Sequence, residues 1–174
     1  SELSQIPSKV QKCVDDQTQY QKVASKLISA DSLLYIGRGL DYALSMEGSL
    51  KLKEISYIHS ESYAAGELKH GTISLIEDGM PVIAVATQHD LYEKTMSNIK
   101  EVKTRGATVV MVCGEDMKFD GNDVDYPVML PLARDLLMPL VAVVPLQLIA
   151  YYTAALKNFD VDHPRNLAKS VTVE

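Results

Sequence analysis

The chain has 174 residues, of which 47% are hydrophobic and 23% charged, which is typical of one soluble globular domain. Its net charge of −6 argues against a general nucleic-acid-binding surface. The N-terminal stretch is polar and shows no secretory signal, and Cys13 and Cys113 lie too far apart for a CxxC motif. We therefore expect a cytoplasmic protein with two free thiols and, because it opens on Ser1, a piece of a longer chain.

The first predicted element is an amphipathic helix over Gln11–Ile28, within a leading linker segment assigned to residues 1–30. Apolar runs bounded by turn signals predict four strands, at Leu33–Ile36, Pro81–Ala86, Thr108–Cys113 and about Val124–Leu130. Helical patterns follow three of the turns, at Asp41–Ile58, Leu91–Thr104 and Leu136–Leu156. This alternation, with strands rich in Val and Ile, predicts a three-layer α/β domain with a mainly parallel sheet.

The last of these segments, Leu136–Leu156, is uncharged and long enough to span a bilayer. Pro139 and Pro145 interrupt it, Gln147 is polar, and no basic cluster flanks one side. A helix that is apolar all round can instead lie between a sheet and a partner subunit. We expect no membrane span.

The loop after the first predicted strand reads GRGLD, at residues 37–41. Ligands in this fold class bind beyond the carboxyl ends of the strands, so this loop is a place to look for a site. It lacks the third glycine of a dinucleotide fingerprint and the Gly-Lys-Ser/Thr of a P-loop. A tight turn is therefore at least as good an interpretation.

Three charged residues follow on the next predicted helix, Glu47, Lys51 and Glu54, at spacings of i, i+4 and i+7. Such a set usually forms an exposed stripe of weak ion pairs. On a helical wheel, however, the three residues fall in the middle of the apolar face, opposite Ser45, Ser49, Ser56 and Lys53. Unpaired buried charges are unfavourable, so the stripe must pair internally, with another charge, or with a ligand. A buried structural triad and an acid–base site both stay open.

His70 follows a predicted helical turn at Gly66–Lys69 and is expected on a loop. A lone loop histidine is usually surface decoration, but one beside a glutamate can share general acid–base work. The other histidines have no metal-ligand spacing with it, and we expect no metal site. Lys169 lies in a tail, residues 160–174, without periodicity. A lysine there is normally solvated, although one with a lowered pKa can form a Schiff base with a carbonyl.

Two long stretches carry a resemblance to a known family: EGSLKLKEISYIHSESYAAGELKHG from Glu47, and VPLQLIAYYTAALKNFDVDHPRNLAKSVTVE to the end of the chain. They closely resemble the C-terminal half of the isomerase region of the glutamine–fructose-6-phosphate aminotransferases, or glucosamine-6-phosphate synthases. The resemblance implies one SIS (sugar isomerase) domain over residues 1–174. It implies an isomerising transaminase that needs no cofactor and converts fructose 6-phosphate and glutamine to glucosamine 6-phosphate and glutamate. The implied partners are a second copy, a first SIS half and a glutaminase domain.

Matched motif for motif, the resemblance implies roles for single residues. Lys169 would form the Schiff base with the open-chain sugar, Glu54 would move the proton between C1 and C2, and His70 would open the ring in the neighbouring subunit's site. Three further positions match residues that contact the substrate or flank the base: Glu47, Lys51 and Ala168.

The family's phosphate-binding loop belongs to the first SIS half, so the isolated chain is expected to be inactive. Two other interpretations stay open. One is a non-catalytic module that binds sugar phosphates, and the other is a dimerisation half whose charges hold an interface.

Overall fold

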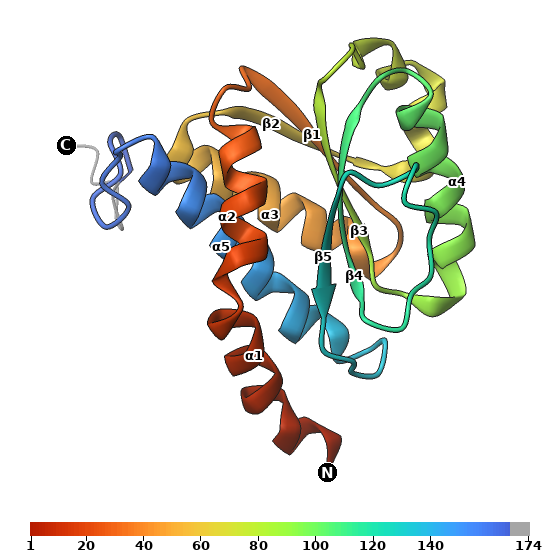
Figure 1. Cartoon of the computed structure of the whole chain (residues 1–174), viewed down its shortest axis with the longest axis vertical. Coiled ribbons are helices and arrows are strands. Elements are labelled where there is room, and N and C mark those ends of the chain that lie inside the picture. The colour runs from red at the N-terminus through yellow and green to blue at the C-terminus, as the bar shows by residue number, and fades with distance from the viewer. Residues whose placement is uncertain (168–174) are drawn as a thin grey trace, which may run out of the picture.

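The computed structural model describes residues 1–167 and shows a five-stranded sheet of order β2-β1-β3-β4-β5 with helices on both faces (Figure 1). The strands are β1 (Ser32–Gly37), β2 (His59–Ala64), β3 (Pro81–Ala86), β4 (Thr108–Gly114) and β5 (Tyr126–Leu130). All four pairings between neighbouring strands are parallel. The predicted three-layer α/β fold is confirmed.

The helices divide between the two faces of this sheet. They are α1 (Ile6–Asp15), α2 (Gln17–Leu27), α3 (Leu40–Ser56), α4 (Tyr92–Lys103) and α5 (Met138–Leu156), with short 3-10 turns η1 (Glu2–Gln5), η2 (Ala65–His70), η3 (Thr72–Leu75) and η4 (His89–Leu91). One face is covered by α2, α3 and α5, with α1 packed against α5, and the other by α4 with η2 and η3 (Figure 1).

Two features of the predicted element order were wrong. The leading helix is broken into α1 and α2 at Asp16, whose φ of −86° and ψ of 71° are not helical. Strand β2 was not predicted, because HSESYA has no apolar run. It is an edge strand, paired only with β1 from His59 to Ala64; Ser60 is buried and its other residues are exposed or partly buried.

The inward face of α3 is its serine and glycine face, which is the reverse of what the helical wheel predicted. Its buried residues are Asp41, Leu44, Ser45, Gly48, Ser49, Leu52 and Ser56. A Cβ added at Gly48 would lie 2.9 Å from the ring of Tyr35 on β1 and 3.2 Å from Leu146 on α5. Small residues on this face therefore let α3 approach the sheet and α5 closely.

The buried hydroxyls on α3 all find hydrogen-bond partners. Ser45 donates to the main-chain oxygen of Asp41 at 2.8 Å, and Ser56 donates to that of Leu52 at 2.7 Å. Ser49 bonds to Ser60 of β2, with 2.9 Å between the hydroxyl oxygens. Because these groups are satisfied, burying serine in place of leucine carries little desolvation penalty.

Helix α5 is long and apolar enough to cross a membrane by length and composition. In this fold it packs against α1, α2 and α3, and Val141, Leu146 and Ile149 are fully buried. Pro145 lies inside the helix without ending it. Packing against these three helices accounts for the buried part of its apolar composition, while Leu140, Tyr151 and Leu156 remain exposed.

Candidate active site

The charged stripe on α3 forms a compact ion-pair set. Lys51 Nζ lies 2.7 Å from Glu54 Oε2 and 3.6 Å from Glu47 Oε1. The hydrogen bond to Glu54 is the main reason that the pKa of Lys51 is raised, so this amine is an ammonium at neutral pH. The side chains of Glu47, Lys51 and Glu54 are 40%, 32% and 22% exposed. All three side chains are therefore partly buried, so the fully buried structural triad is wrong and the partly buried acid–base site stays a prediction.

The surface around the stripe is apolar. Leu40, Met46 and Leu50 of α3 are all exposed, on the side of the helix that faces away from the sheet. We call these three side chains the outer apolar face of α3. Apolar side chains exposed on one side of a helix make that side a candidate interface.

The stripe does not lie where ligands usually bind in this fold class. Helix α3 starts after β1 and runs back to the start of β2, so Glu54 is near the amino ends of the strands. The GRGLD loop lies at the carboxyl ends of the strands. There the Asp41 side chain bonds to the loop that follows β3. Asp41 Oδ2 accepts hydrogen bonds from the main-chain nitrogens of Thr87, at 2.8 Å, and Gln88, at 3.2 Å. Its Oδ1 accepts one from the Thr87 hydroxyl at 2.6 Å.

This arrangement supports the tight-turn interpretation of GRGLD. Gly39 has a φ of +54°, which a residue with a side chain rarely adopts. Burial raises the pKa of Asp41, while the hydrogen bonds from Thr87 and Gln88 oppose that rise. The Asp41 carboxylate accepts hydrogen bonds from the main-chain amides of Thr87 and Gln88, so these amides are not free to bind an anionic ligand.

A second network, which was not predicted, joins the loops that follow β3, β4 and β5. His89 Nδ1 lies 2.6 Å from Asp135 Oδ1, and His89 Nε2 lies 3.0 Å from Asp116 Oδ2. The main-chain nitrogen of His89 also donates to Asp135 at 2.9 Å. The bonds to Asp116 and Asp135 raise the pKa of His89. The sequence holds no signal for this cluster, because its members are far apart and meet only through the parallel order of the strands.

The other predicted site residues are not brought to the stripe. His70 ends η2, whose Ala65 and Leu68 pack with α4 on the opposite face of the sheet from α3. Its side chain is 64% exposed, with Nε2 3.9 Å from Glu67 Oε2. Within one chain, His70 therefore does not lie near Glu54, although the two residues are close in sequence. Ala168 and Lys169 lie outside the described residues.

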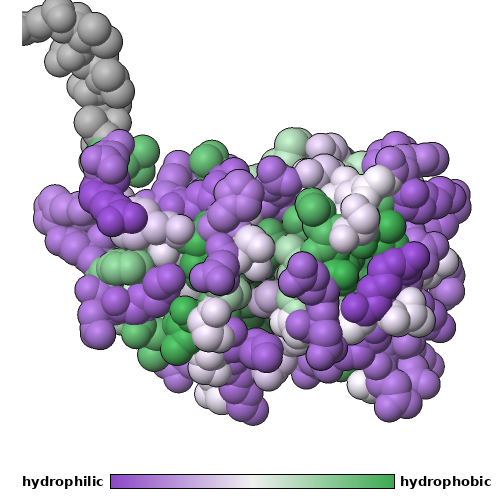
Figure 2. All heavy atoms as spheres, turned by 90° about the horizontal axis from the view of Figure 1, so that it is seen from above, coloured by the Kyte–Doolittle hydropathy of each residue, from purple (hydrophilic) through white to green (hydrophobic). Residues whose placement is uncertain are grey.

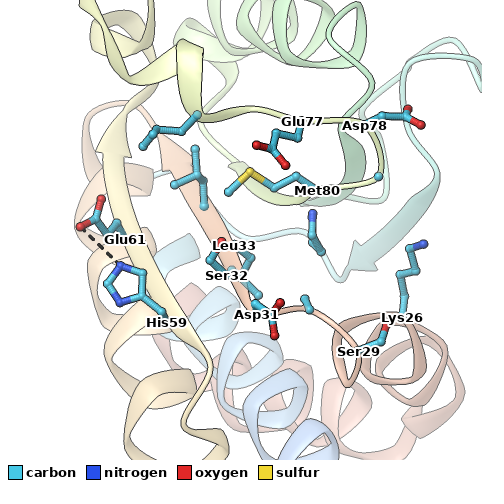
Figure 3. Close-up of a pocket in the computed structure, with 15 residues that line it drawn as sticks. Lys26, Ser29, Asp31, Ser32, Leu33, His59, Glu61, Glu77, Asp78 and Met80 are labelled. Carbon is cyan, nitrogen blue, oxygen red and sulfur yellow. Dashed lines mark ion pairs between the residues drawn. The ribbon is translucent and has the colours of Figure 1, made fainter.

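A cavity of about 630 Å³ lies at the amino ends of β1 and β3, and its lining includes His59, paired with Glu61 at 3.6 Å (Figure 3). Figure 2 looks onto this end of the molecule and shows apolar surface framed by hydrophilic residues. Asp31, Glu77 and Asp78 add further carboxylates to its lining (Figure 3). An acidic rim repels a phosphate dianion, and none of the predicted site residues that the structure describes lines this cavity.

Comparison with known proteins identifies the domain family and similar proteins. The SIS domain family matches residues 26–157. The glutamine–fructose-6-phosphate aminotransferase [isomerizing] of Caldanaerobacter subterraneus subsp. tengcongensis is 57% identical over 175 residues, which is 100% of this chain and 29% of that protein. The counterpart from Methanosarcina acetivorans is 46% identical over 174 residues, which is 100% of this chain and 28% of that protein. The chain thus spans under a third of these relatives.

Among solved structures, the C-terminal domain of glucosamine-fructose-6-phosphate aminotransferase from Francisella tularensis is similar, with a TM-score of 0.85 and 37% identity. That match covers 93% of this chain and 46% of the other. The predicted resemblance to these aminotransferases is therefore confirmed. By its fold and by the match over most of its length, this chain belongs to the SIS domain family.

Proposed function

We propose that this chain supplies the proton-transfer part of the sugar site in an isomerising glutamine–fructose-6-phosphate aminotransferase. The observation that carries the proposal is the Glu47–Lys51–Glu54 stripe, held by ion pairs on an outward face of α3. It lies within a chain that is 57% identical over its whole length to a relative of this name. A stripe that only stabilised the fold would not require a surrounding face of exposed Leu and Met.

In this proposal Glu54 is the base. Lys51 holds the Glu54 carboxylate at 2.7 Å, which places it to accept a proton from C1 of a sugar imine and return it to C2. The Lys169 amine would condense with the C2 carbonyl of the open-chain sugar to a Schiff base, with release of water, and ammonia from glutamine would then displace the Lys169 amine to give the C2 imine on which Glu54 acts. The Ala168 main chain would contact the sugar, and the neighbouring subunit's copy of His70 would open the ring.

The remaining parts of the site would come from chain beyond this sequence. The relatives are more than three times as long as the segment matched. We propose that their first SIS half, which would bring the phosphate-binding loop, covers the outer apolar face of α3, and that the assembly is a cytoplasmic homodimer. The acidic cavity of Figure 3 would not bind the sugar phosphate.

The experiment is borohydride trapping in the full-length protein with fructose 6-phosphate. The sugar should become attached to the peptide NLAKSVTVE, and Lys169→Arg should abolish the attachment because a guanidinium does not add to a carbonyl. Lys94→Arg, at an exposed position on α4 across the sheet from α3, is the matched control and should label normally. Saturable sugar binding without any trapped adduct would instead support a non-catalytic binding module.

A further inference from the structure

Tyr57, the residue that ends α3, has an uncommon backbone conformation. Its φ of 61° and ψ of 13° are left-handed, and its main-chain nitrogen donates to Lys53. Helices most often place glycine at such a position, because a side chain there costs about 1–2 kcal/mol. The other non-glycine residues with positive φ in the described part of the chain are Asn158 and Asn166, a residue type that tolerates this region well. A tyrosine at this position therefore needs compensating contacts.

Those contacts are all made to the segment that follows α5. The Tyr57 hydroxyl accepts a hydrogen bond of 2.9 Å from the main-chain nitrogen of Arg165. The Arg165 guanidinium lies over the ring, 4.1 Å from its centroid. The ring of Phe159 packs at 5.0 Å between centroids, tilted by 59°. We call this arrangement of Tyr57, Phe159 and Arg165 the tail clamp.

The segment held by the tail clamp has a defined local structure. Asp160 accepts hydrogen bonds from the main-chain nitrogens of Asp162 and His163, at 2.9 Å and 3.1 Å. The bond from the His163 main chain is the main reason that the pKa of Asp160 is lowered. Phe159 is itself joined to the end of α5 through its main-chain bond to Ala154 at 3.0 Å. The chain between α5 and Arg165 is thus built as a turn, and Tyr57 contacts both of its ends.

The position of the clamp relates two predicted site residues. Glu54 lies three residues before Tyr57 on α3, a rise of about 4.5 Å along the helix axis. Lys169 lies four residues after Arg165, and four residues of chain reach at most about 14 Å. Fixing Arg165 on Tyr57 therefore limits how far along the chain Lys169 can lie from the end of α3, the helix that carries Glu54. In Figure 1 the segment that follows α5 lies beside that end of α3. Such confinement raises the effective concentration of a reacting group.

We infer that Tyr57 is a positioning residue, which clamps the base of the C-terminal tail to the end of α3 and so presents Lys169 to the sugar carbonyl near Glu54. The inference rests on the proposed function and adds to it a residue that touches neither substrate nor reacting atoms. The strained backbone at Tyr57 is then explained, because glycine would relax the backbone but would delete every contact of the clamp.

The test uses three variants of the full-length protein. Tyr57→Gly relieves the left-handed strain and removes the clamp, Tyr57→Phe removes only the hydroxyl, and Arg165→Ala removes only the stacked guanidinium. Hydrogen exchange of the peptide covering residues 159–167 reports the clamp directly, and should be faster in Tyr57→Gly. Borohydride trapping on Lys169 and kcat for glucosamine 6-phosphate should fall about 10- to 100-fold in that variant, the scale expected for a misplaced reacting group.

The graded variants sharpen this test. Tyr57→Phe should lose about 2- to 5-fold in kcat, less than Tyr57→Gly, because the ring still stacks. The double variant Tyr57→Gly with Arg165→Ala should be no worse than Tyr57→Gly alone, since both changes remove the same interaction. Glutamine hydrolysis measured without sugar, and the thermal unfolding midpoint, should stay close to wild type in all of them.

The outcomes separate the two proposals. If wild-type protein traps sugar on Lys169 and Tyr57→Gly traps it equally well, the positioning role is wrong. If exchange of residues 159–167 is the same in wild type and Tyr57→Gly, the clamp itself is wrong. If wild-type protein traps no sugar, the proposed function fails first and the role of Tyr57 fails with it, whatever the exchange data show.

Discussion

The charged residues at the carboxyl ends of the strands and those on the outward side of α3 differ in how far they are enclosed by the chain. At the carboxyl ends, Asp41 is buried and accepts three hydrogen bonds, and His89 is held between Asp116 and Asp135. On α3, Glu47, Lys51 and Glu54 hold one another on a half-exposed apolar surface. The first region is complete within one chain, whereas the second has ion pairs but no covering layer.

This difference shows why the usual rule for ligand position in α/β folds does not locate the candidate site here. A crevice at the carboxyl ends binds an anion through free main-chain amides and loop side chains. In this chain Asp41 already uses the amides of Thr87 and Gln88. The chemically incomplete surface is the one on α3, and an incomplete surface is where a substrate and further chain would bind.

The largest effect is expected for Glu54→Gln in the full-length protein. The amide keeps the shape of the side chain but cannot accept the substrate proton, so isomerisation should fall by about 10²- to 10⁴-fold. Glutamine hydrolysis should persist, and both rates can be measured on the same preparation. Equal loss of both activities would instead make Glu54 a structural partner of Lys51.

The next largest effect is expected for Asp41, at the carboxyl ends of the strands. Asp41→Ala leaves three buried donors on Thr87 and Gln88 without their acceptor, and should lower the free energy of unfolding by about 2–4 kcal/mol. Urea unfolding of the 174-residue chain measures this change. Glu77→Ala, at an exposed position near the opposite end of the strands, is the control and should change it by less than about 0.5 kcal/mol. A loss as small as the control would show that water replaces the carboxylate.

A smaller and pH-dependent effect is expected for His89. Asp116 and Asp135 raise its folded-state pKa above the unfolded value of about 6.5. The stabilisation is therefore fully present below pH about 6.5 and is lost as the pH rises through the folded pKa. Because the side chain is half exposed, the gain should be at most about 1 kcal/mol.

The measurement for His89 compares wild type with His89→Gln by urea unfolding at several pH values. The difference between the two proteins should be largest at acidic pH and should shrink as the pH rises. A difference that grows toward alkaline pH would contradict the assignment of a protonated imidazole between two carboxylates.

The smallest effect on the stability of this chain is expected from Met46→Lys with Leu50→Lys on the outer apolar face of α3. Both side chains are exposed, so the free energy of unfolding of the 174-residue chain should change by less than about 0.5 kcal/mol per substitution. In the full-length protein the same pair should weaken assembly and activity, because a covered apolar face would now hold charges. Normal assembly of the full-length variant would show that this face remains open to water.

Much of this protein can be predicted from its residues one segment at a time. The apolar runs of β1, β3 and β4, rich in Val and Ile in β3 and β4, are recognisable because a strand buried on both faces is apolar along most of its length. The spacing of Glu47, Lys51 and Glu54 places them on one side of a helix in any fold. The long motifs around Glu54 and His70 were enough to indicate the family.

Tertiary structure alone decided which side of α3 faces the core. A hydropathy wheel ranks serine and glycine as outward residues, but close packing rewards small side chains, and each buried hydroxyl finds a partner in the fold. The same holds for the placement of His70 across the sheet from Glu54, and for Tyr57, whose contacts lie more than a hundred residues away at Phe159 and Arg165. Local sequence carries no record of such neighbours, because packing brings them together only when the whole chain folds.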